Sequence, residues 1–233
     1  MSARSAKARR AIVSASNFWR RAYCPGSYRC ESAAPKIPAG EAAEFGTRMH
    51  KLMERPIDDA PEEHRETLEW AHARVADVWR EWIPGMFRES TVHRELVVRD
   101  ESGSYLGRLD WCAISRSRGL VADYKFGRKP AEEGEAESNH QLALYAVGLW
   151  NYMPGLQEIA GVLIYPMLRR VTPMVTFGRK ELDATRRLYE ATVTRCADEN
   201  APTKDGDWCK YCAGPAGGCP SAWRSMEEIL ASL

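Results

Sequence analysis

Two carboxylates and a lysine lie close together near the middle of this 233-residue sequence. Asp110 falls within an apolar run at residues 105–114. Asp123 and Lys125 fall within a second run at residues 120–126. Both runs have the apolar, β-branched and aromatic content that is typical of strands. We therefore expect two neighbouring strands that carry all three charged side chains.

The residues between the two runs, 115–119, are polar and predict a hairpin turn. Alternate side chains of a strand point to the same face, so Asp123 and Lys125 should project together and Tyr124 away. Carboxylates at the centre of a sheet are costly as core residues, because a buried charge needs a partner. A divalent cation removes that cost, and Mg²⁺ prefers carboxylate, water and phosphate oxygens. This pattern indicates metal-assisted hydrolysis of a phosphodiester.

Three short motifs follow one another along the chain. They are Gly107-x-x-Asp110, Asp123-x-Lys125 and Gln141-x-x-x-Tyr145. In this order they resemble the PD-(D/E)XK nuclease superfamily, and most of all its RecB-like exonuclease branch, over roughly the whole chain. The resemblance implies a DNA exonuclease that depends on Mg²⁺ or Mn²⁺. In such an enzyme Asp110 and Asp123 hold the metal and Lys125 positions the attacking water.

The same resemblance implies further metal ligands. The helix predicted at residues 41–54 contains Gly46-x-x-x-His50, a pattern whose histidine faces the metals in RecB-like relatives. The alternative for His50 is a partly buried polar side chain. The backbone carbonyl of Tyr124 is an additional implied ligand. Glu95, on a predicted strand, ranks below the two aspartates because it could equally be a structural residue.

Gln141 and Tyr145 are four residues apart in a helix predicted at residues 138–152, so they share one face. The resemblance implies that this face looks toward the metals and that both side chains orient the DNA strand. Ordinary packing against the sheet is the alternative for Tyr145.

Three cysteines late in the chain have a spacing typical of a metal site. Cys209-x2-Cys212-x6-Cys219 lies in a Gly/Pro-rich segment, and thiols so close together favour a metal in a reducing compartment. Cys24 is the main candidate for a fourth ligand, and Cys30 is its rival. RecB-like exonucleases with an iron–sulfur cluster use one early and three late cysteines, so the resemblance implies a [4Fe-4S] cluster on Cys24, Cys209, Cys212 and Cys219. Zinc at the same thiols is the alternative.

The bulk composition is that of an ordinary globular protein, with 44% hydrophobic residues, 28% charged residues and a net charge of +1. No apolar run is long enough to span a bilayer, and the N-terminal residues lack the apolar core of a secretory signal. We therefore expect no membrane association and a cytoplasmic protein, either bacterial or phage-encoded in a host. Basic pairs such as Arg20-Arg21 are expected on solvated faces.

The predicted element order favours a mixed α/β fold, with a central sheet flanked by helices. The predicted helices are residues 41–54, 63–82, 138–152 and 180–199. The predicted strands are residues 93–98, 105–114, 120–126, 159–165 and 171–177. A charged loop is predicted at residues 127–137. We expect a disordered basic tail at residues 1–11 and a single nuclease domain at residues 12–233. The catalytic sheet core would span residues 92–178, and residues 12–31 and 205–223 would be joined by the metal cluster.

The expected function is a metal-dependent DNA exonuclease in recombination, repair, or phage or CRISPR DNA processing. The alternative is a DNA-end-binding accessory module of a larger recombination complex, with little hydrolysis of its own. The complete set of two aspartates and a lysine argues against that alternative. The chain has no Gly-x-x-x-x-Gly-Lys-Ser/Thr motif, so a recombination or helicase partner would have to supply ATP-driven unwinding. The sequence does not decide between single- and double-stranded substrates, or between exo and endo action. It leaves the polarity of digestion and the oligomeric state open as well.

Overall fold

A six-stranded mixed sheet forms the centre of the computed structural model, which describes residues 11–36, 38, 40–84, 89–127 and 134–222. Antiparallel pairing joins β1 (Thr91–Arg99) to β2 (Tyr105–Ser115), and β2 to β3 (Arg118–Tyr124). β4 (Glu158–Tyr165) pairs with β3 in parallel. Two short strands, β5 (Arg170–Val171) and β6 (Val175–Phe177), both pair antiparallel with β4. The parallel step needs a crossover, and a helix supplies it.

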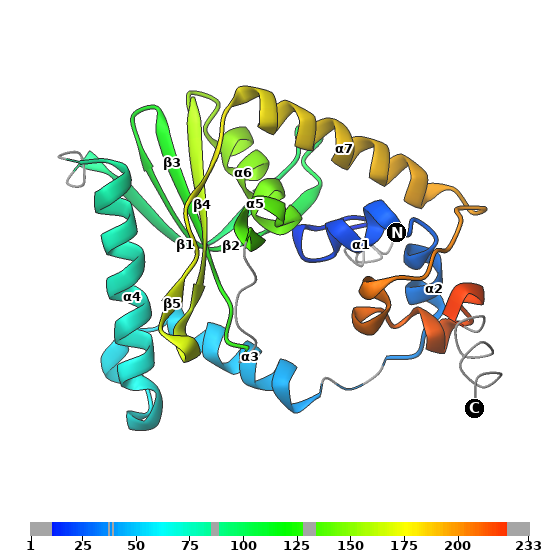
Figure 1. Ribbon diagram of the computed structural model, residues 1–233, viewed down its shortest axis with the longest axis horizontal. Coiled ribbons are helices and arrows are strands. Elements are labelled where there is room, and N and C mark those ends of the chain that lie inside the picture. Colours follow the sequence, from blue (N-terminus) through cyan, green and yellow to red (C-terminus); the bar gives the residue numbers. More distant parts are fainter. Residues whose placement is uncertain (1–10, 37, 39, 85–88, 128–133, 223–233) are drawn as a thin grey trace, which may run out of the picture.

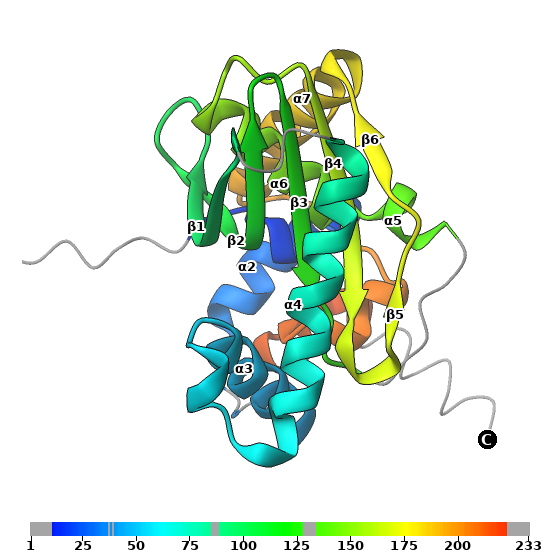
Figure 2. The same ribbon diagram turned by 90° about the vertical axis from the view of Figure 1, so that its left-hand side faces the viewer.

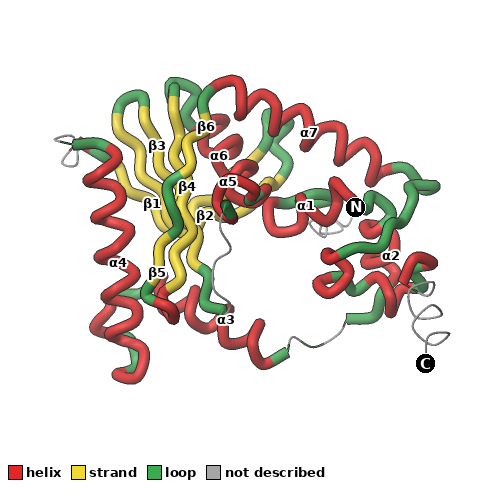
Figure 3. Tube along the Cα trace, in the orientation of Figure 1, coloured by secondary structure: helices red, strands yellow, loops and turns green. Residues whose placement is uncertain are grey.

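Helices cover both faces of this sheet (Figures 1 and 2). One face carries α3 (Glu41–Met53) and α4 (Glu62–Trp82), and the other carries α6 (His140–Tyr152) and α7 (Arg179–Ala197). Figure 3 shows the shorter helical turns that precede, join and follow these four helices. These are η1 (Ala15–Asn17), α1 (Phe18–Tyr23), α2 (Ser27–Ala33), η2 (Ile57–Asp59), α5 (Glu135–Ser138), η4 (Pro166–Leu168), η5 (Asp207–Tyr211) and η6 (Gly214–Gly217). None of the helices in the described part of the chain is both long and apolar enough to cross a membrane.

The core consists of two apolar layers, one on each side of the sheet. On the α4 side, Trp79 packs in a cluster with Leu120 and Ala122 of β3. On the α6 side, Leu149 packs in a cluster with Val121 of the same strand. Alternate residues of β3 thus feed opposite layers, as the period of a strand requires. The sheet is therefore a rigid base on which charged side chains can be held.

Segments from the two ends of the chain pack together on the side of the molecule away from α4 (Figure 1). Arg20 donates to the backbone oxygen of Tyr211 at 2.9 Å, across 191 positions of sequence. Arg20 and Arg21 also pair with Glu31, at 2.9 and 2.6 Å. The prediction that this basic pair lies on a solvated face was wrong, because both arginines are buried and share an ion pair with Glu31. A Cβ on Gly217 would lie 1.9 Å from the carbonyl oxygen of Cys30, so this contact depends on glycine.

The predicted mixed α/β architecture is confirmed, and each predicted strand or long helix has its counterpart in the structure. α2 has no counterpart among the predicted elements. Most of the predicted tail, residues 1–10, lies outside the described residues. The division into one domain with two joined end segments stays a prediction.

The predicted hairpin of β2 and β3 is confirmed, and three predicted segments differ from the structure in their bounds. The strand at residues 171–177 is split into β5 and β6, because Pro173 between them has no N–H to continue the pairing. The loop at residues 127–137 ends in the helical turn α5, while residues 128–133 lie outside the described part. The turn at residues 115–119 is shorter than predicted, with only two residues between β2 and β3, and Arg116 has a φ of +48°. Two-residue hairpin loops favour positive φ, since their twist then matches that of the strands.

Candidate active site

The two aspartates and the lysine meet where the pairing of β2 with β3 ends, next to the Trp111–Ala122 pair. Lys125 Nζ lies 2.6 Å from Asp123 Oδ2, and the carboxylate of Asp123 is only 2% exposed. Asp110 Oδ2 accepts a hydrogen bond of 2.8 Å from the backbone N–H of Tyr124. The Tyr124 ring packs in the opposite layer, with α4. The predicted split of alternate side chains between the faces is therefore confirmed for this strand.

Electrostatic coupling is strong in this group. Burial raises the pKa of Asp123, and the charge of Asp110 raises it further, while Lys125 opposes the change. Burial acts to lower the pKa of Lys125, but the charge and hydrogen bond of Asp123 outweigh it and leave that pKa raised. The lysine is therefore held as a cation beside two carboxylates. A cation at this position is suited to act on an anionic substrate.

A side chain of α6 completes the arrangement. Gln141 Oε1 accepts from Lys125 at 2.8 Å, and Gln141 Nε2 donates to Asp123 Oδ1 at 2.9 Å. The same Nε2 lies 3.0 Å from the hydroxyl oxygen of Tyr145, one turn along the helix. Gln141 thus fixes the positions of Lys125 and Asp123. Its contact with Tyr145 is the one expected for two residues four apart on a helix.

Gly107 explains the first position of the Gly107-x-x-Asp110 motif. A Cβ at this glycine would lie 2.5 Å from Cε1 of the Tyr145 ring. The absence of a side chain lets the tyrosine ring lie directly on β2. The glycine therefore positions Tyr145 and, through it, Gln141.

Two more ionisable residues border the site. His50 of α3 places Nδ1 3.4 Å from Asp110 Oδ1 and packs its ring edge against Phe126. Burial opposes the charged form of His50, yet the hydrogen bond and charge of Asp110 leave its pKa raised. Glu95 of β1 pairs with Arg108 at 2.6 Å. Burial raises the pKa of Glu95, and the nearby Asp110 adds to the effect.

The side-chain alternation of the sheet reverses at this point. Leu109 packs in the layer below α6, whereas Trp111, two residues later, packs in the layer below α4. On β1, Glu95 lies between the positions that pair with these two residues and has a φ of +54°. Positive φ in a non-glycine residue costs free energy and is concentrated at functional sites. The register of β1 and β2 sets Glu95 opposite Asp110, close enough for the charge of Asp110 to act on it.

These residues line one broad groove of about 1400 Å³. His50, Glu95, Asp110, Asp123, Lys125, Gln141 and Tyr145 all contribute to its surface. The structure therefore brings together every predicted side chain of the nuclease centre and adds Glu95. The groove is larger than the pockets that usually hold a single small molecule.

The donor set suits a hydrated divalent cation. Within the described residues, no three His, Cys, Asp or Glu side chains converge to hold a metal by themselves. Mg²⁺ needs only one or two carboxylates, because waters and phosphate oxygens fill its other positions. Asp123 Oδ2 is buried, and its polar neighbour is the ammonium of Lys125 at 2.6 Å. Asp110 and Asp123 therefore fit Mg²⁺ or Mn²⁺.

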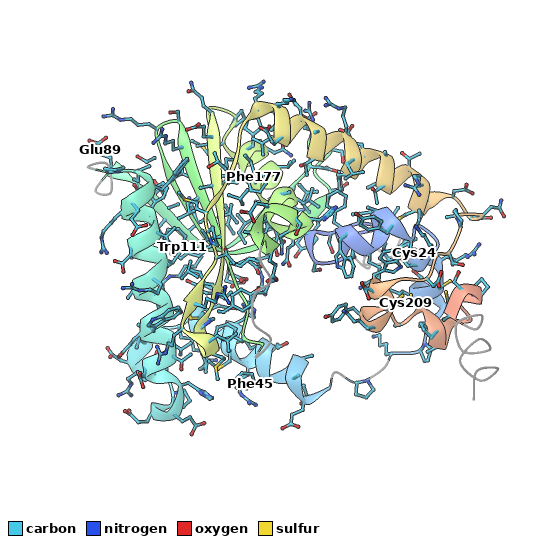
Figure 4. The ribbon with its side chains drawn as sticks, in the orientation of Figure 1. Cys24, Phe45, Glu89, Trp111, Phe177 and Cys209 are labelled. Atoms are coloured by element: carbon cyan, nitrogen blue, oxygen red, sulfur yellow. The ribbon has the colours of Figure 1, made fainter. Side chains whose placement is uncertain are left out.

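Figure 4 shows two of the predicted cysteine ligands, Cys24 and Cys209, where the two ends of the chain meet. A Cβ on Gly214 would lie 3.0 Å from Cys212 Sγ, 3.2 Å from Cys30 Cβ and 3.5 Å from Cys219 Cβ. Cys24 interacts electrostatically with Cys219 and Cys209, and burial raises the pKa of Cys24. We call Cys24, Cys30, Cys209, Cys212 and Cys219 the cysteine region.

The thiols of this region are free, and no disulfide joins them. Backbone N–H groups point at two of them: Lys204 donates to Cys24 Sγ at 3.2 Å, and Gly214 donates to Cys212 Sγ at 3.3 Å. Cys30 lies against Cys219, and burial together with this neighbour raises the pKa of Cys30. The rival fourth ligand is therefore present beside the preferred one. The two remaining cysteines, Cys112 and Cys196, are buried in the apolar cluster on the α6 side of the sheet, as predicted for small apolar residues.

Residues 12–216 match the family model of the PD-(D/E)XK nuclease superfamily. The chain belongs to the PD-(D/E)XK nuclease superfamily. Its mixed sheet and flanking helices agree with that fold, and its groove of carboxylates supports a nuclease function. PD-(D/E)XK nucleases typically use Mg²⁺ or Mn²⁺, and a nuclease fold implies binding of DNA.

Two solved structures are similar to this PD-(D/E)XK protein. One is a protein from Eubacterium rectale named as a candidate exonuclease, with a TM-score of 0.46 and 12% identity, covering 91% of this chain and 93% of the other. The second is SSO0001, with a TM-score of 0.42 and 19% identity, covering 93% and 90%. Both likenesses are weak, and no assignment depends on them. No curated protein is significantly similar in sequence.

Proposed function

We propose that this protein is a Mg²⁺- or Mn²⁺-dependent deoxyribonuclease of the RecB-like exonuclease branch, which hydrolyses phosphodiester bonds at DNA ends. The convergence of Asp110, Asp123 and Lys125 in one groove carries the proposal. A module that only binds DNA has no need of a lysine fixed between a buried aspartate and a glutamine. Recombination, repair and phage or CRISPR DNA processing are the settings that fit such an enzyme, with unwinding supplied by a helicase partner.

Each residue of the site has a role in this proposal. Asp110 and Asp123 hold the cation, with the carbonyl of Tyr124 and the imidazole of His50 beside it. When bound, the cation lowers the pKa of a water and neutralises charge on the scissile phosphate. Lys125 orients the attacking water and stabilises negative charge that develops on the phosphate. Glu95 adds a third carboxylate, from β1, the strand that pairs with β2.

Gln141 and Tyr145 act on the substrate strand and on the lysine. Gln141 restrains the ammonium of Lys125 through one hydrogen bond and the carboxylate of Asp123 through another. Tyr145 has its hydroxyl beside this amide and lines the groove. We propose that the pair keeps Lys125 aimed at the phosphate while the DNA strand advances.

We also propose that Cys24, Cys209, Cys212 and Cys219 hold a [4Fe-4S] cluster, with zinc as the alternative metal and Cys30 as the alternative ligand. The free thiols and the N–H groups directed at Cys24 and Cys212 support a metal at this place. No three of the cysteines converge in the described residues, so a bound metal would have to draw their thiols together. Backbone N–H donors stabilise the thiolate form, which is the form that binds metal. The cluster would be structural, joining the two ends of the chain.

The deciding experiment measures shortening of end-labelled single- and double-stranded DNA by anaerobically purified protein, with Mg²⁺, with Mn²⁺ and without divalent metal. Asp110→Asn should lose cleavage, and the exposed Asp58→Asn should keep it. Cleavage by Asp110→Asn at the parental rate would refute the assignment. Binding without any shortening by the parental protein would favour an accessory module instead. Visible absorption and metal analysis of the same sample separate a brown iron–sulfur protein from a colourless zinc protein.

A further inference from the structure

Four aromatic rings from opposite ends of the chain gather at one side of the active-site groove. Trp19 and Tyr23 come from α1, and Trp208 and Tyr211 come from η5. The rings of Tyr23 and Trp208 are stacked, with centroids 5.1 Å apart and planes at 8°. Trp19 meets Trp208 and Tyr211 edge to face, each at 6.2 Å. We call these four residues the aromatic wall.

The aromatic wall is not part of either core layer. Tyr23 is 49% exposed and Tyr211 is 59% exposed, and neither belongs to the two apolar clusters. Large apolar rings gathered at a surface mark a binding site more often than a structural need. By contrast Trp150, beside a smaller cavity, is buried and covered by the guanidinium groups of Arg179 and Arg186.

The wall faces the reacting groups. Trp19, Tyr23 and Tyr211 line the same groove as Asp110, Asp123 and Lys125. In Figure 1, α1 and the C-terminal segment lie to the right of α3, which carries His50. A strand that lies in this groove with one phosphate at the carboxylates therefore passes the exposed rings.

Positive charge accompanies the rings. Lys210 Nζ lies 5.2 Å from the centre of the Tyr211 ring, and Lys204 Nζ lies 6.0 Å from that of Trp208. Lys51 and Arg55, near the end of α3, line the groove as well. In the described part of the chain, none of these four cations is in an ion pair with an acidic side chain. Exposed rings with unpaired cations beside them are the combination that binds single-stranded nucleic acid.

We propose that the aromatic wall binds the unpaired bases of single-stranded DNA and makes this nuclease select single-stranded ends; the inference rests on the nuclease function proposed above. Bases inside a duplex have both faces covered by their neighbours, so, apart from the outer face of a terminal pair, only an unpaired base can stack on Tyr211 or Tyr23. The cations hold the phosphates of the same strand. Because every base has a π-face, this contact requires no particular sequence.

The test compares Tyr211→Leu and Tyr211→Phe with Tyr152→Ala, which alters a tyrosine that is 48% exposed outside the groove. Fluorescence anisotropy in the absence of divalent metal measures binding to a labelled single strand and to a duplex of the same sequence. Tyr211→Leu should weaken single-strand binding about 5- to 100-fold and leave duplex binding unchanged. Tyr211→Phe and Tyr152→Ala should bind both as the parent does. Circular dichroism melting verifies that each variant is folded.

An equal loss for single strand and duplex, or no loss at all, would overturn the inference. Because binding is measured without divalent metal, it is independent of cleavage. Ring-dependent binding of single strands by a protein that never cleaves would sustain the wall and reject the nuclease proposal. Cleavage with no preference for single strands would sustain the nuclease proposal and reject the role of the aromatic wall.

Discussion

Asp110 on β2 accepts the backbone N–H of Tyr124 on β3 at 2.8 Å, so a proposed metal ligand also closes the hydrogen bonding between two strands. One carboxylate oxygen serves the fold, while the other faces His50 at 3.4 Å. Substitutions of Asp110 can therefore separate the structural role from the chemical one.

For Asp110, asparagine keeps an oxygen that accepts from Tyr124, and alanine does not. Asp110→Asn should unfold at nearly the parental urea midpoint, whereas Asp110→Ala should lose about 1–2 kcal/mol of unfolding free energy. Both should lose cleavage. Urea unfolding followed by circular dichroism, with a nuclease assay on the same samples, measures the two effects. Equal stability of the two variants would show that the hydrogen bond contributes nothing.

Removing Lys125 should leave the carboxylate of Asp123 buried and unpaired. Lys125→Ala should abolish cleavage. It should also lower the free energy of unfolding by about 1–3 kcal/mol, less than for a fully buried ion pair, because the lysine side chain is 31% exposed to solvent. A bound cation would take over the role of the ammonium, so Mg²⁺ should raise the melting temperature more in Lys125→Ala than in the parent. Thermal melts with and without Mg²⁺ test this, with Lys180→Ala on α7 as control. A smaller Mg²⁺ response in Lys125→Ala would contradict the expectation.

Adding a methyl group at Gly107 should push the Tyr145 ring away from β2. Gly107→Ala should lower stability by about 1–3 kcal/mol and reduce cleavage, since Gln141 moves with the helix. Gly155→Ala, where nothing lies within 4 Å, is the control. In a double-mutant cycle, Tyr145→Leu should relieve the clash, so that the two changes cost less together than their sum. Strict additivity would exclude this contact as the cause.

Burial lowers the pKa of His72 on α4 to about 4, and Arg94 contributes to the shift. The folded protein then binds fewer protons than the unfolded chain between the ordinary value of 6.5 and about 4. Stability is therefore complete above this range and falls as the pH decreases through it, by about 1–3 kcal/mol. His72→Gln should reduce the slope of unfolding free energy against pH in this range. An unchanged slope in urea titrations would remove His72 as the source.

The sequence predicts those parts of the site that depend on short spacings. The strand period places Asp123 beside Lys125, and helical spacing places Gln141 beside Tyr145. Glu95 was ranked low because a glutamate on a strand could equally be structural; its place opposite Asp110 depends on the register of β1 against β2, which no short spacing reveals. The burial of Arg20 and Arg21 was missed for a similar reason, since Glu31 lies on α2, which was not predicted. Features that depend on distant packing escape a reading based on periodicity.

The docking of the chain ends also has a consequence for biosynthesis. The catalytic strands and α6 are complete by residue 165, but the aromatic wall needs η5, which begins at Asp207. Contacts across 191 positions close slowly and only after the late segment has left the ribosome. A nascent chain therefore assembles its reacting carboxylates well before its groove has a second side. Ribosome-bound chains would carry the proposed metal ligands without the proposed DNA contacts of the aromatic wall, and we expect DNA binding by the complete groove only late in synthesis.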